Sequence, residues 1–290
     1  MPSSSRTVTV VTGASTGIGR ATALRQTRAG DRVWALMRDP DAAADLRDLA
    51  EAEGLDLALG TCDVTDDDAV AAAFDAVLAR DGRVDRLVCN AGAYAGATLE
   101  THAMDEIRAL FEVNVFGALR CIRAVLPGMR EARAGTIVAL SSQSSQAILP
   151  TWAAYAGSKR ALEGALEALA MEVAGFGIRV HLVQPGSTLT AMRGKIRPRE
   201  NPPEYERMLE RYRAVITADR TTSLAPDDVA RAIERVLADP HAPWRTLVGD
   251  DAVRNTARRA AATDEEWTAL FGIDADDAFF DAWTRLGEGR

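Results

Sequence analysis

The sequence predicts an α/β fold built on a doubly wound parallel sheet, with helices on both faces in three layers. Short apolar runs rich in β-branched residues alternate with longer amphipathic runs along most of the chain, which is typical of repeated strand-helix-strand units. Glycine or polar residues follow four of the short runs, at Gly13, Asp63, Asn90 and Ser142. Because ligands of such sheets bind at the carboxyl ends of the strands, we expect these four residues to share one site.

Composition and charge are those of an ordinary globular protein. The chain has 290 residues, of which 47% are hydrophobic and 26% charged, enough for one large core. Its net charge of −8 argues against nonspecific binding to nucleic acid. Without a secretory signal pattern or an apolar run of about 18 residues, we expect a cytoplasmic protein that has no membrane partner. Three cysteines and three histidines are too few and scattered for a disulfide framework or a metal site.

The first half of the chain contains a candidate phosphate-binding loop. Strands are expected over residues 7–12, 32–37, 55–62 and 84–89. Between them we expect a helix from the end of the glycine stretch to about residue 29, and helices over about 41–53 and 66–80. The stretch Gly13-Ala14-Ser15-Thr16-Gly17-Ile18-Gly19 joins the first strand to the first helix. Its glycines let the backbone approach a phosphate, which the amides and dipole of the helix N-terminus attract. The alternative is a plain strand-to-helix turn.

Arg38 closes the second strand and bears on the choice of cofactor. In dinucleotide-binding folds an acid near this point binds the ribose 2′-hydroxyl, whereas an arginine accommodates a 2′-phosphate. Arg38 therefore favours NADP(H) over NAD(H), while the following Asp39 favours the opposite choice. A solvated arginine with no ligand is the structural alternative.

The second half continues the pattern and then departs from it. A long helix is expected over residues 105–129, strands over 136–140, 179–183 and 245–248, and a helix over 226–238. Residues 187–224 are rich in proline and charge, with one amphipathic piece over 204–215, and we expect a substrate lid there. Residues 1–250 would thus form one catalytic domain. Residues 251–290 would add two or three short helical pieces as a C-terminal extension packed on that domain.

The stretch 141–159 carries the candidate catalytic groups. Tyr155 and Lys159 lie four residues apart on one helix face, and Ser142 stands thirteen residues before the tyrosine. An ammonium near a phenol favours the phenolate, so we expect the pKa of Tyr155 to fall below its usual value of about 10. Such a tyrosine can move protons as carbonyl reduction requires, although both side chains could simply occupy a solvated face. Asn114, inside an apolar helical stretch, needs a hydrogen-bonding role.

Together these residues resemble the short-chain dehydrogenase/reductase family over roughly residues 7–248, and within it the branch of 17β-hydroxysteroid dehydrogenases, retinol dehydrogenases and ketoreductases. The resemblance implies a Rossmann-type fold and a homodimer or homotetramer. It rests on an ordered series of motifs: Thr12 to Gly19, Asp63-Val64, Asn90-Ala91-Gly92, Asn114, Ser142, Tyr155-Ala156-Gly157-Ser158-Lys159, and Pro185-Gly186 with Thr190.

The resemblance also implies a reaction and the residues that perform it. A hydride would pass between NADP(H) and a carbonyl or secondary alcohol carbon, with Tyr155 as proton donor or acceptor. Lys159 would lower the tyrosine pKa and bind the nicotinamide ribose, Ser142 would polarise the substrate oxygen, and Asn114 would hold a water. The implied cofactor-binding residues are Gly13, Ser15, Thr16, Gly17, Ile18, Gly19, Arg38, Asp63, Val64, Asn90, Ala91, Gly92, Tyr155, Lys159, Pro185, Gly186, Thr188 and Thr190.

The substrate is the least specified part of the site. Aromatic and methionine side chains near the lid would form an apolar cavity suited to a bulky hydrophobic ketone, unless several of them are core residues: Tyr94, Trp152, Met192, Tyr205, Met208 and Tyr212. Three other functions stay open at this point. They are an NADP-sensing regulator that binds a protein partner, an NAD-dependent alcohol dehydrogenase, and a nucleotide-sugar epimerase or dehydratase, which usually carries a larger C-terminal domain.

Overall fold

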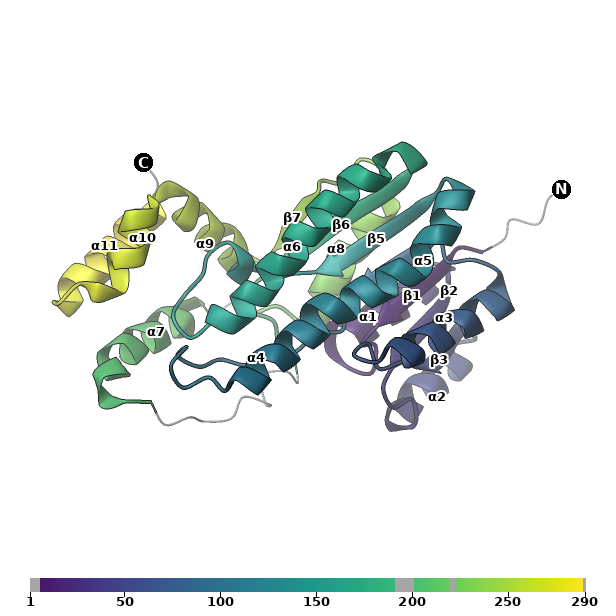
Figure 1. Cartoon of the computed structure of the whole chain (residues 1–290), viewed down its shortest axis with the longest axis horizontal. Coiled ribbons are helices and arrows are strands. Elements are labelled where there is room, and N and C mark those ends of the chain that lie inside the picture. The colour runs from purple at the N-terminus through teal and green to yellow at the C-terminus, as the bar shows by residue number, and fades with distance from the viewer. Residues whose placement is uncertain (1–5, 191–200, 220–222, 289–290) are drawn as a thin grey trace.

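Seven parallel strands form one sheet between two layers of helices (Figure 1). The computed structural model describes residues 6–190, 201–219 and 223–288. The strand order is β3-β2-β1-β4-β5-β6-β7, so the order reverses between β1 and β4, and the predicted doubly wound fold is confirmed. The strands are β1 (Val8–Thr12), β2 (Arg32–Met37), β3 (Leu57–Thr61), β4 (Arg86–Cys89), β5 (Gly135–Leu140), β6 (Ile178–Pro185) and β7 (Arg245–Val248).

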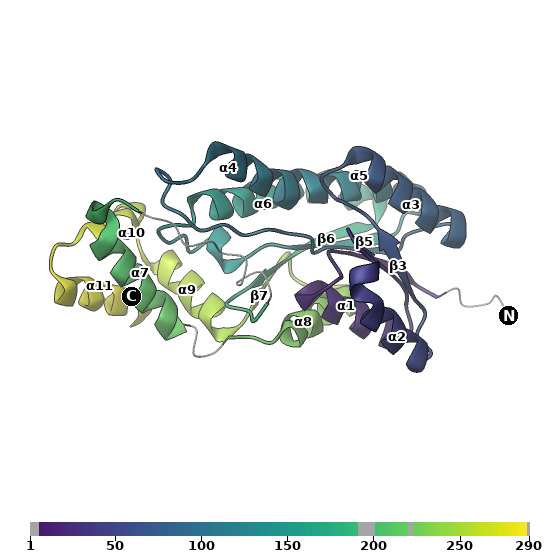
Figure 2. The same ribbon diagram turned by 90° about the horizontal axis from the view of Figure 1, so that it is seen from below.

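The helices divide between the two faces of the sheet, as Figure 2 shows from below. One face is covered by α1 (Gly17–Arg28), α2 (Ala44–Ala52) and α8 (Pro226–Ala238). The other carries α3 (Asp67–Asp81), α4 (Met104–Phe111), α5 (Ala118–Ala132) and α6 (Ala153–Val173). Each face has its own buried apolar cluster. Because the sheet is buried on both sides, its strands read as continuous apolar runs rather than alternating ones.

The predicted long helix over residues 105–129 is interrupted. A π-helical segment, Glu112–Gly117, separates α4 from α5, and Asn114 lies within it. The apolar spacing of the sequence predicted one continuous helix and did not reveal this segment. Such bulges are frequent at functional sites.

Residues 203–219 of the predicted lid and the C-terminal extension pack together beyond the carboxyl ends of the strands (Figure 1). The predicted lid contains a short 3-10 turn (Pro203–Tyr205) and α7 (Glu206–Asp219). The extension contains α9 (Asp250–Ala261), α10 (Asp264–Ala269), a second turn (Leu270–Gly272) and α11 (Asp276–Glu288). Arg211 of α7 joins them, since its Nε donates to Asp276 Oδ1 at 2.8 Å and its guanidinium lies 4.8 Å from the centre of the Phe279 ring. No helix of the described residues is long and apolar enough to cross a membrane.

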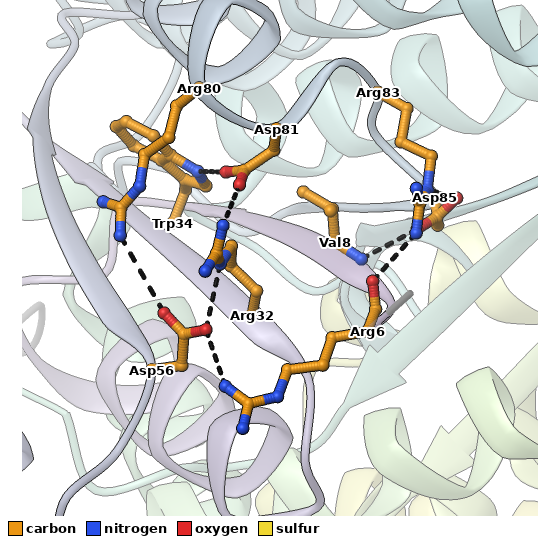
Figure 3. Close-up of polar contacts among 9 residues, drawn as sticks. All are labelled: Arg6, Val8, Arg32, Trp34, Asp56, Arg80, Asp81, Arg83 and Asp85. Carbon is orange, nitrogen blue, oxygen red and sulfur yellow. Dashed lines mark hydrogen bonds and ion pairs between the residues drawn. The ribbon is translucent and has the colours of Figure 1, made fainter. Parts of the chain in front are cut away.

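The opposite end of the sheet is held by ion pairs, drawn in Figure 3. Arg32, the first residue of β2, pairs with both Asp56 and Asp81, and Trp34 Nε1 donates to Asp81 Oδ2 at 2.7 Å. Burial acts to raise the pKa of Asp81, but the hydrogen bonds from Trp34 and Arg32 outweigh it and lower that pKa. Arg6 adds a pair to Asp56 at 2.9 Å. These contacts fasten the starts of β2 and β3 to the end of α3.

Candidate active site

The loop after β1 forms a cradle of backbone at the start of α1. Gly13 and Gly17 have left-handed φ angles of +65° and +59°, which favour glycine. A Cβ atom at Gly13 would lie 2.7 Å from Ala91 Cα, and one at Gly19 would collide with the Asn90 side chain. The first amides of α1 have no partner within the helix and lie at the positive end of its dipole. The loop therefore fits the pyrophosphate of a dinucleotide.

Asn90 fixes this loop to the end of β4. Its Nδ2 donates to the carbonyls of Thr12 and Gly13, at 2.9 and 3.0 Å. The Thr12 hydroxyl accepts in return from the amides of Asn90 and Ala91, each at 3.1 Å. Two residues predicted for the cofactor cleft are thus brought directly against the glycine loop. The other predicted residues of that loop and its first helical turn lie beside them: Ser15, Thr16 and Ile18.

Arg38 and Asp39 follow β2 and take different roles. Asp39 Oδ1 accepts from the amides of Asp41 and Ala42, at 3.1 and 3.3 Å, and so caps the next turn. Arg38 is exposed and has no hydrogen bond or ion pair within the described part of the chain. The acidic side chain is therefore committed to the backbone, while the basic one is available to a ligand.

Asp63 and Val64 stand at the end of β3. The Asp63 carboxylate accepts from the amide and the hydroxyl of Thr65, at 2.9 and 2.8 Å. These bonds, and then the nearby charge of Arg38, lower the pKa of Asp63. Val64 packs on Gly117 of the π-helical segment, where a Cβ would lie 2.7 Å from its methyl carbon. The two residues are held rigidly at the same edge as the glycine loop.

Tyr155 and Ser142 meet where β5 leads into α6. The Ser142 hydroxyl accepts from the amide of Ser144 at 3.2 Å. Burial raises the pKa of Tyr155, and the neighbouring Ser142 hydroxyl opposes that rise without cancelling it. The expectation of a lowered tyrosine pKa is therefore wrong for this structure, because desolvation of the phenolate is the largest effect. The phenol keeps its proton at neutral pH.

Lys159 is buried one turn further along α6. Its Nζ donates to the carbonyl of Leu140 at 2.8 Å and lies 5.9 Å from the centre of the Tyr155 ring. Burial lowers the pKa of Lys159 to about 8, although the charge of Glu163 acts against this fall. Glu163 was not singled out in the sequence, although its spacing of four residues from Lys159 places it on the same helix face.

Asn114 links the π-helical segment to Ala93, which follows β4, and to Ser158 of α6. Its Oδ1 accepts from the amide of Ala93 at 2.7 Å, and its Nδ2 donates to the carbonyl of Ala93 at 3.0 Å and to Ser158 Oγ at 2.9 Å. A Cβ at Gly92 would lie 3.3 Å from Asn114 Oδ1 and 3.6 Å from Lys159 Nζ. Asn114, Gly92 and Lys159 therefore converge on one point.

The loop after β6 lies beside the glycine loop. The amide of Gly186, which follows Pro185, donates to the carbonyl of Val248 at 2.8 Å, and the Thr188 hydroxyl donates to the carbonyl of Gly186 at 3.1 Å. The Thr190 methyl carbon would lie 3.4 Å from a Cβ at Gly17. This loop consequently reaches across to the glycine loop.

Three of the predicted pocket residues form a continuous aromatic wall beside the tyrosine. The rings of Tyr94 and Tyr155 pack edge to face with centroids 4.9 Å apart. Trp152 Nε1 donates to the Tyr212 hydroxyl at 2.9 Å. Trp152 also belongs to the buried cluster formed with the C-terminal extension, so it serves as core as well as wall.

The remaining pocket predictions have different outcomes. Met192 lies outside the described residues. The Tyr205 hydroxyl donates to Glu100 at 2.8 Å on an exposed side. Met208 is a half-buried residue of α7.

Several known proteins are similar to this chain in sequence or structure. The family model described as short chain dehydrogenase matches residues 7–201. The chain belongs to the short-chain dehydrogenase/reductase family. The chain is 38% identical over 198 residues to rat estradiol 17-beta-dehydrogenase 1, a match that covers 66% of this chain and 56% of that protein. It is 32% identical over 245 residues to the 3-ketodihydrosphingosine reductase of Bacteroides thetaiotaomicron, covering 83% of this chain and 87% of that one.

Solved structures of family members have the same fold. A short-chain dehydrogenase from Streptomyces avermitilis matches with a TM-score of 0.82 and 37% identity, covering 92% of this chain and 97% of that chain. A metagenomic short-chain oxidoreductase in complex with NADP matches at TM-score 0.68 and 32% identity, with 85% and 98% covered. A Burkholderia phymatum member in complex with NAD matches at 0.73 and 27%, with 85% and 90% covered. Family members of this shape thus bind either nicotinamide dinucleotide.

Proposed function

We propose that this family member interconverts a ketone and a secondary alcohol with a nicotinamide cofactor. The observation that carries the proposal is the meeting of Tyr155, Ser142 and Lys159 at the carboxyl edge of the sheet, in the same cleft as the glycine loop. A phenol, a hydroxyl and an ammonium in a largely desolvated site can polarise a carbonyl oxygen and supply its proton.

Each side chain has a distinct part in the proposed reaction. The bound cofactor supplies or accepts the hydride. Ser142 and Tyr155 donate hydrogen bonds to the substrate oxygen, and the Tyr155 phenol gives its proton to the alkoxide that develops there. The raised pKa of Tyr155 keeps this proton in place until the alkoxide, a stronger base, accepts it. Lys159 presents a positive charge beside the ring and holds the ribose. Asn114 keeps one lone pair of Oδ1 for a water next to Lys159.

We also propose a preference for NADP(H) over NAD(H). The support is the contrast after β2, where Asp39 caps the backbone and Arg38 is exposed with no partner among the described residues. A guanidinium in this place matches a 2′-phosphate. Asp63 and Val64 would flank the adenine, and Thr188 and Thr190 would face the carboxamide side. Titration of the purified protein with NADPH and NADH tests this, and tighter binding of NADH would contradict it.

The proposed substrate is a bulky hydrophobic ketone. The wall of Tyr94, Trp152 and Tyr212 beside Tyr155 offers apolar surface with few polar groups. Two matched relatives are named for a steroid alcohol and for a long-chain keto compound. A panel of aromatic, steroid and long-chain ketones, compared with small polar ones, should show higher kcat/KM for the hydrophobic members.

The decisive experiment is the substitution Tyr155→Phe. It removes only the hydroxyl, so NADPH should still bind, while kcat should fall by about 10²–10⁴-fold because the proton donor is gone. The matched control is Tyr205→Phe, which removes a hydroxyl that bonds Glu100 outside the site and should leave kcat unchanged. Near-normal turnover in Tyr155→Phe would refute the assignment of the donor.

We further propose a homodimer or homotetramer, which light scattering of the purified protein would test.

A further inference from the structure

A buried chain of polar side chains runs from the C-terminal extension to the turn that follows Ser142. Arg258 donates to Asn255 Oδ1 at 2.7 Å, and Asn255 Nδ2 donates to Gln143 Oε1 at 3.3 Å. Gln143 Nε2 then donates to Asp251 Oδ2 at 3.1 Å. All four side chains are buried, and Asp251 is 0% exposed. The sequence analysis did not single out any of these four residues, because Gln143 is far from the other three in the sequence.

The charges at the two ends determine the direction of every bond in this chain. A guanidinium can only donate and a carboxylate can only accept. Asn255 must therefore present its carbonyl oxygen to Arg258, which leaves its nitrogen to face Gln143. Gln143 must in turn present its nitrogen to Asp251. Flipping either amide would set donor against donor, so the side chain of Gln143 has one allowed orientation.

Asp251 holds a second loop at the same time. Its Oδ2 also accepts from the amide of Ser187 at 2.6 Å. Its Oδ1 lies so close to Gly186 that any Cβ at that position would collide with it. Asp251 itself stands in the first turn of α9, where the helix dipole favours a carboxylate. One carboxylate thus contacts both the residue after Ser142 and the loop after β6.

We propose that Asp251 is a positioning residue for the reaction. The C-terminal extension uses this carboxylate to set the turn of Ser142 against the loop of residues 185–188. The inference rests on the proposed function, in which Ser142 polarises the substrate oxygen and that loop faces the cofactor. Asp251 touches no reacting atom, and it acts through Gln143 and through the amide of Ser187. The extension is therefore part of the catalytic apparatus rather than only a cover.

The test compares Asp251→Ala with Asp250→Ala. Asp250 is the neighbouring carboxylate in the same helical turn, and it is exposed, so it controls for the loss of a negative charge at the start of α9. Hydrogen-deuterium exchange without cofactor reports directly on residues 142–146 and 185–188. Steady-state kinetics with NADPH and the best ketone reports kcat and KM separately.

We expect Asp251→Ala to speed exchange in both segments and to lower kcat by about 100-fold, since small misplacements of positioned groups have effects of this size. The KM for NADPH should change far less, because the glycine loop is untouched. Asp250→Ala should match the wild type in both measurements. Wild-type exchange and kcat in Asp251→Ala, or equal losses in both variants, would overturn the proposal.

Two further outcomes have assigned meanings. If Asp251→Ala does not fold, Gln143→Leu replaces it, because leucine removes the amide that donates to Asp251 Oδ2 and leaves the bond from the Ser187 amide in place. Faster exchange at residues 142–146 and a lower kcat in that variant support the proposal, whereas wild-type values overturn it. If the wild type reduces no ketone, the proposed function fails, and the exchange of residues 142–146 and 185–188 still supports or overturns the positioning by Asp251.

Discussion

The two ends of the sheet use polar residues in opposite ways. At the amino end, arginines and aspartates form ion pairs near the surface, with Arg6 64% exposed and Arg32 33% exposed. At the carboxyl end the polar groups are buried amides, hydroxyls and a few charges, and directed hydrogen bonds hold several of them, such as Asn114 and Gln143. Exposed pairs cost little to form and contribute little, whereas buried polar groups are costly unless they are fully bonded. We therefore expect substitutions of buried polar groups at the carboxyl end to affect catalysis, and substitutions of ion pairs at the amino end to affect stability alone.

Among the substitutions considered, Lys159→Ala at the carboxyl end should have the largest effect on activity. Loss of the buried ammonium removes the positive charge beside Tyr155, so kcat/KM for ketone reduction should fall by about 100-fold or more. Stability should change little or rise, because burial disfavours that charge. Kinetics and thermal melting of the same preparation measure both effects. Equal activity in this variant and the wild type would remove Lys159 from the mechanism.

A pH profile should sharpen this picture. With a pKa of about 8, Lys159 is protonated below that value and loses its charge as the pH rises through it, so reductive kcat/KM should decline above about pH 8. Glu163→Gln removes a carboxylate that raises this pKa. The decline should therefore begin at lower pH in the variant. A profile that stays the same in the variant would show that another group titrates.

At the amino end, Asp81→Ala should affect stability alone. The Asp81 side chain is 2% exposed and accepts from both Trp34 and Arg32. Its loss leaves the buried Trp34 Nε1 without this acceptor and Arg32 with Asp56 alone. We expect a decrease of about 1–3 kcal/mol in the free energy of unfolding, measured by urea denaturation, with kcat unchanged. A fall in kcat without loss of stability would contradict the division between the ends.

The same residue gives a pH prediction with a definite sign. The pKa of Asp81 is lower in the folded protein than its usual value near 3.9, so its stabilising contribution is present above that value. The contribution is lost as the pH falls through the lowered pKa. Asp81→Asn should therefore reduce the difference in stability between neutral and acidic pH. An unchanged acid dependence would show that other carboxylates account for it.

The smallest effect should come from Arg6→Ala. The pair between Arg6 and Asp56 is largely exposed, and Asp56 keeps its second partner Arg32. The free energy of unfolding should change by less than about 1 kcal/mol. The measurement is again urea denaturation, and added salt should make the variant and the wild type converge. A decrease in the free energy of unfolding as large as that of Asp81→Ala would mean that exposure does not explain the different contributions of the Arg6–Asp56 and Arg32–Asp81 pairs.

Local pattern was sufficient for most of the fold and for the core of the site. The strand and helix order followed from apolar periodicity, and the positions after Thr12, Cys62, Cys89 and Ser141 followed from the rule that ligands meet the carboxyl ends of strands. The pocket could be predicted only in part, because Tyr205 and Tyr212 belong to one segment and yet face different sides. Helical spacing gives faces, but the packing of α7 against the extension decides which face covers the site.

What the sequence determined by itself was the order of elements and the glycine loop, and it also supplied the proposed catalytic groups, because each depends on residues close together in the chain. Tertiary structure alone decided their chemical state and their supports. The pKa of Tyr155 is raised by the surroundings that bury it, against the local influence expected from Lys159. The bond between Gln143 and Asp251 joins residues 108 positions apart. Desolvation and such distant contacts depend on how the whole chain packs, which no local pattern contains.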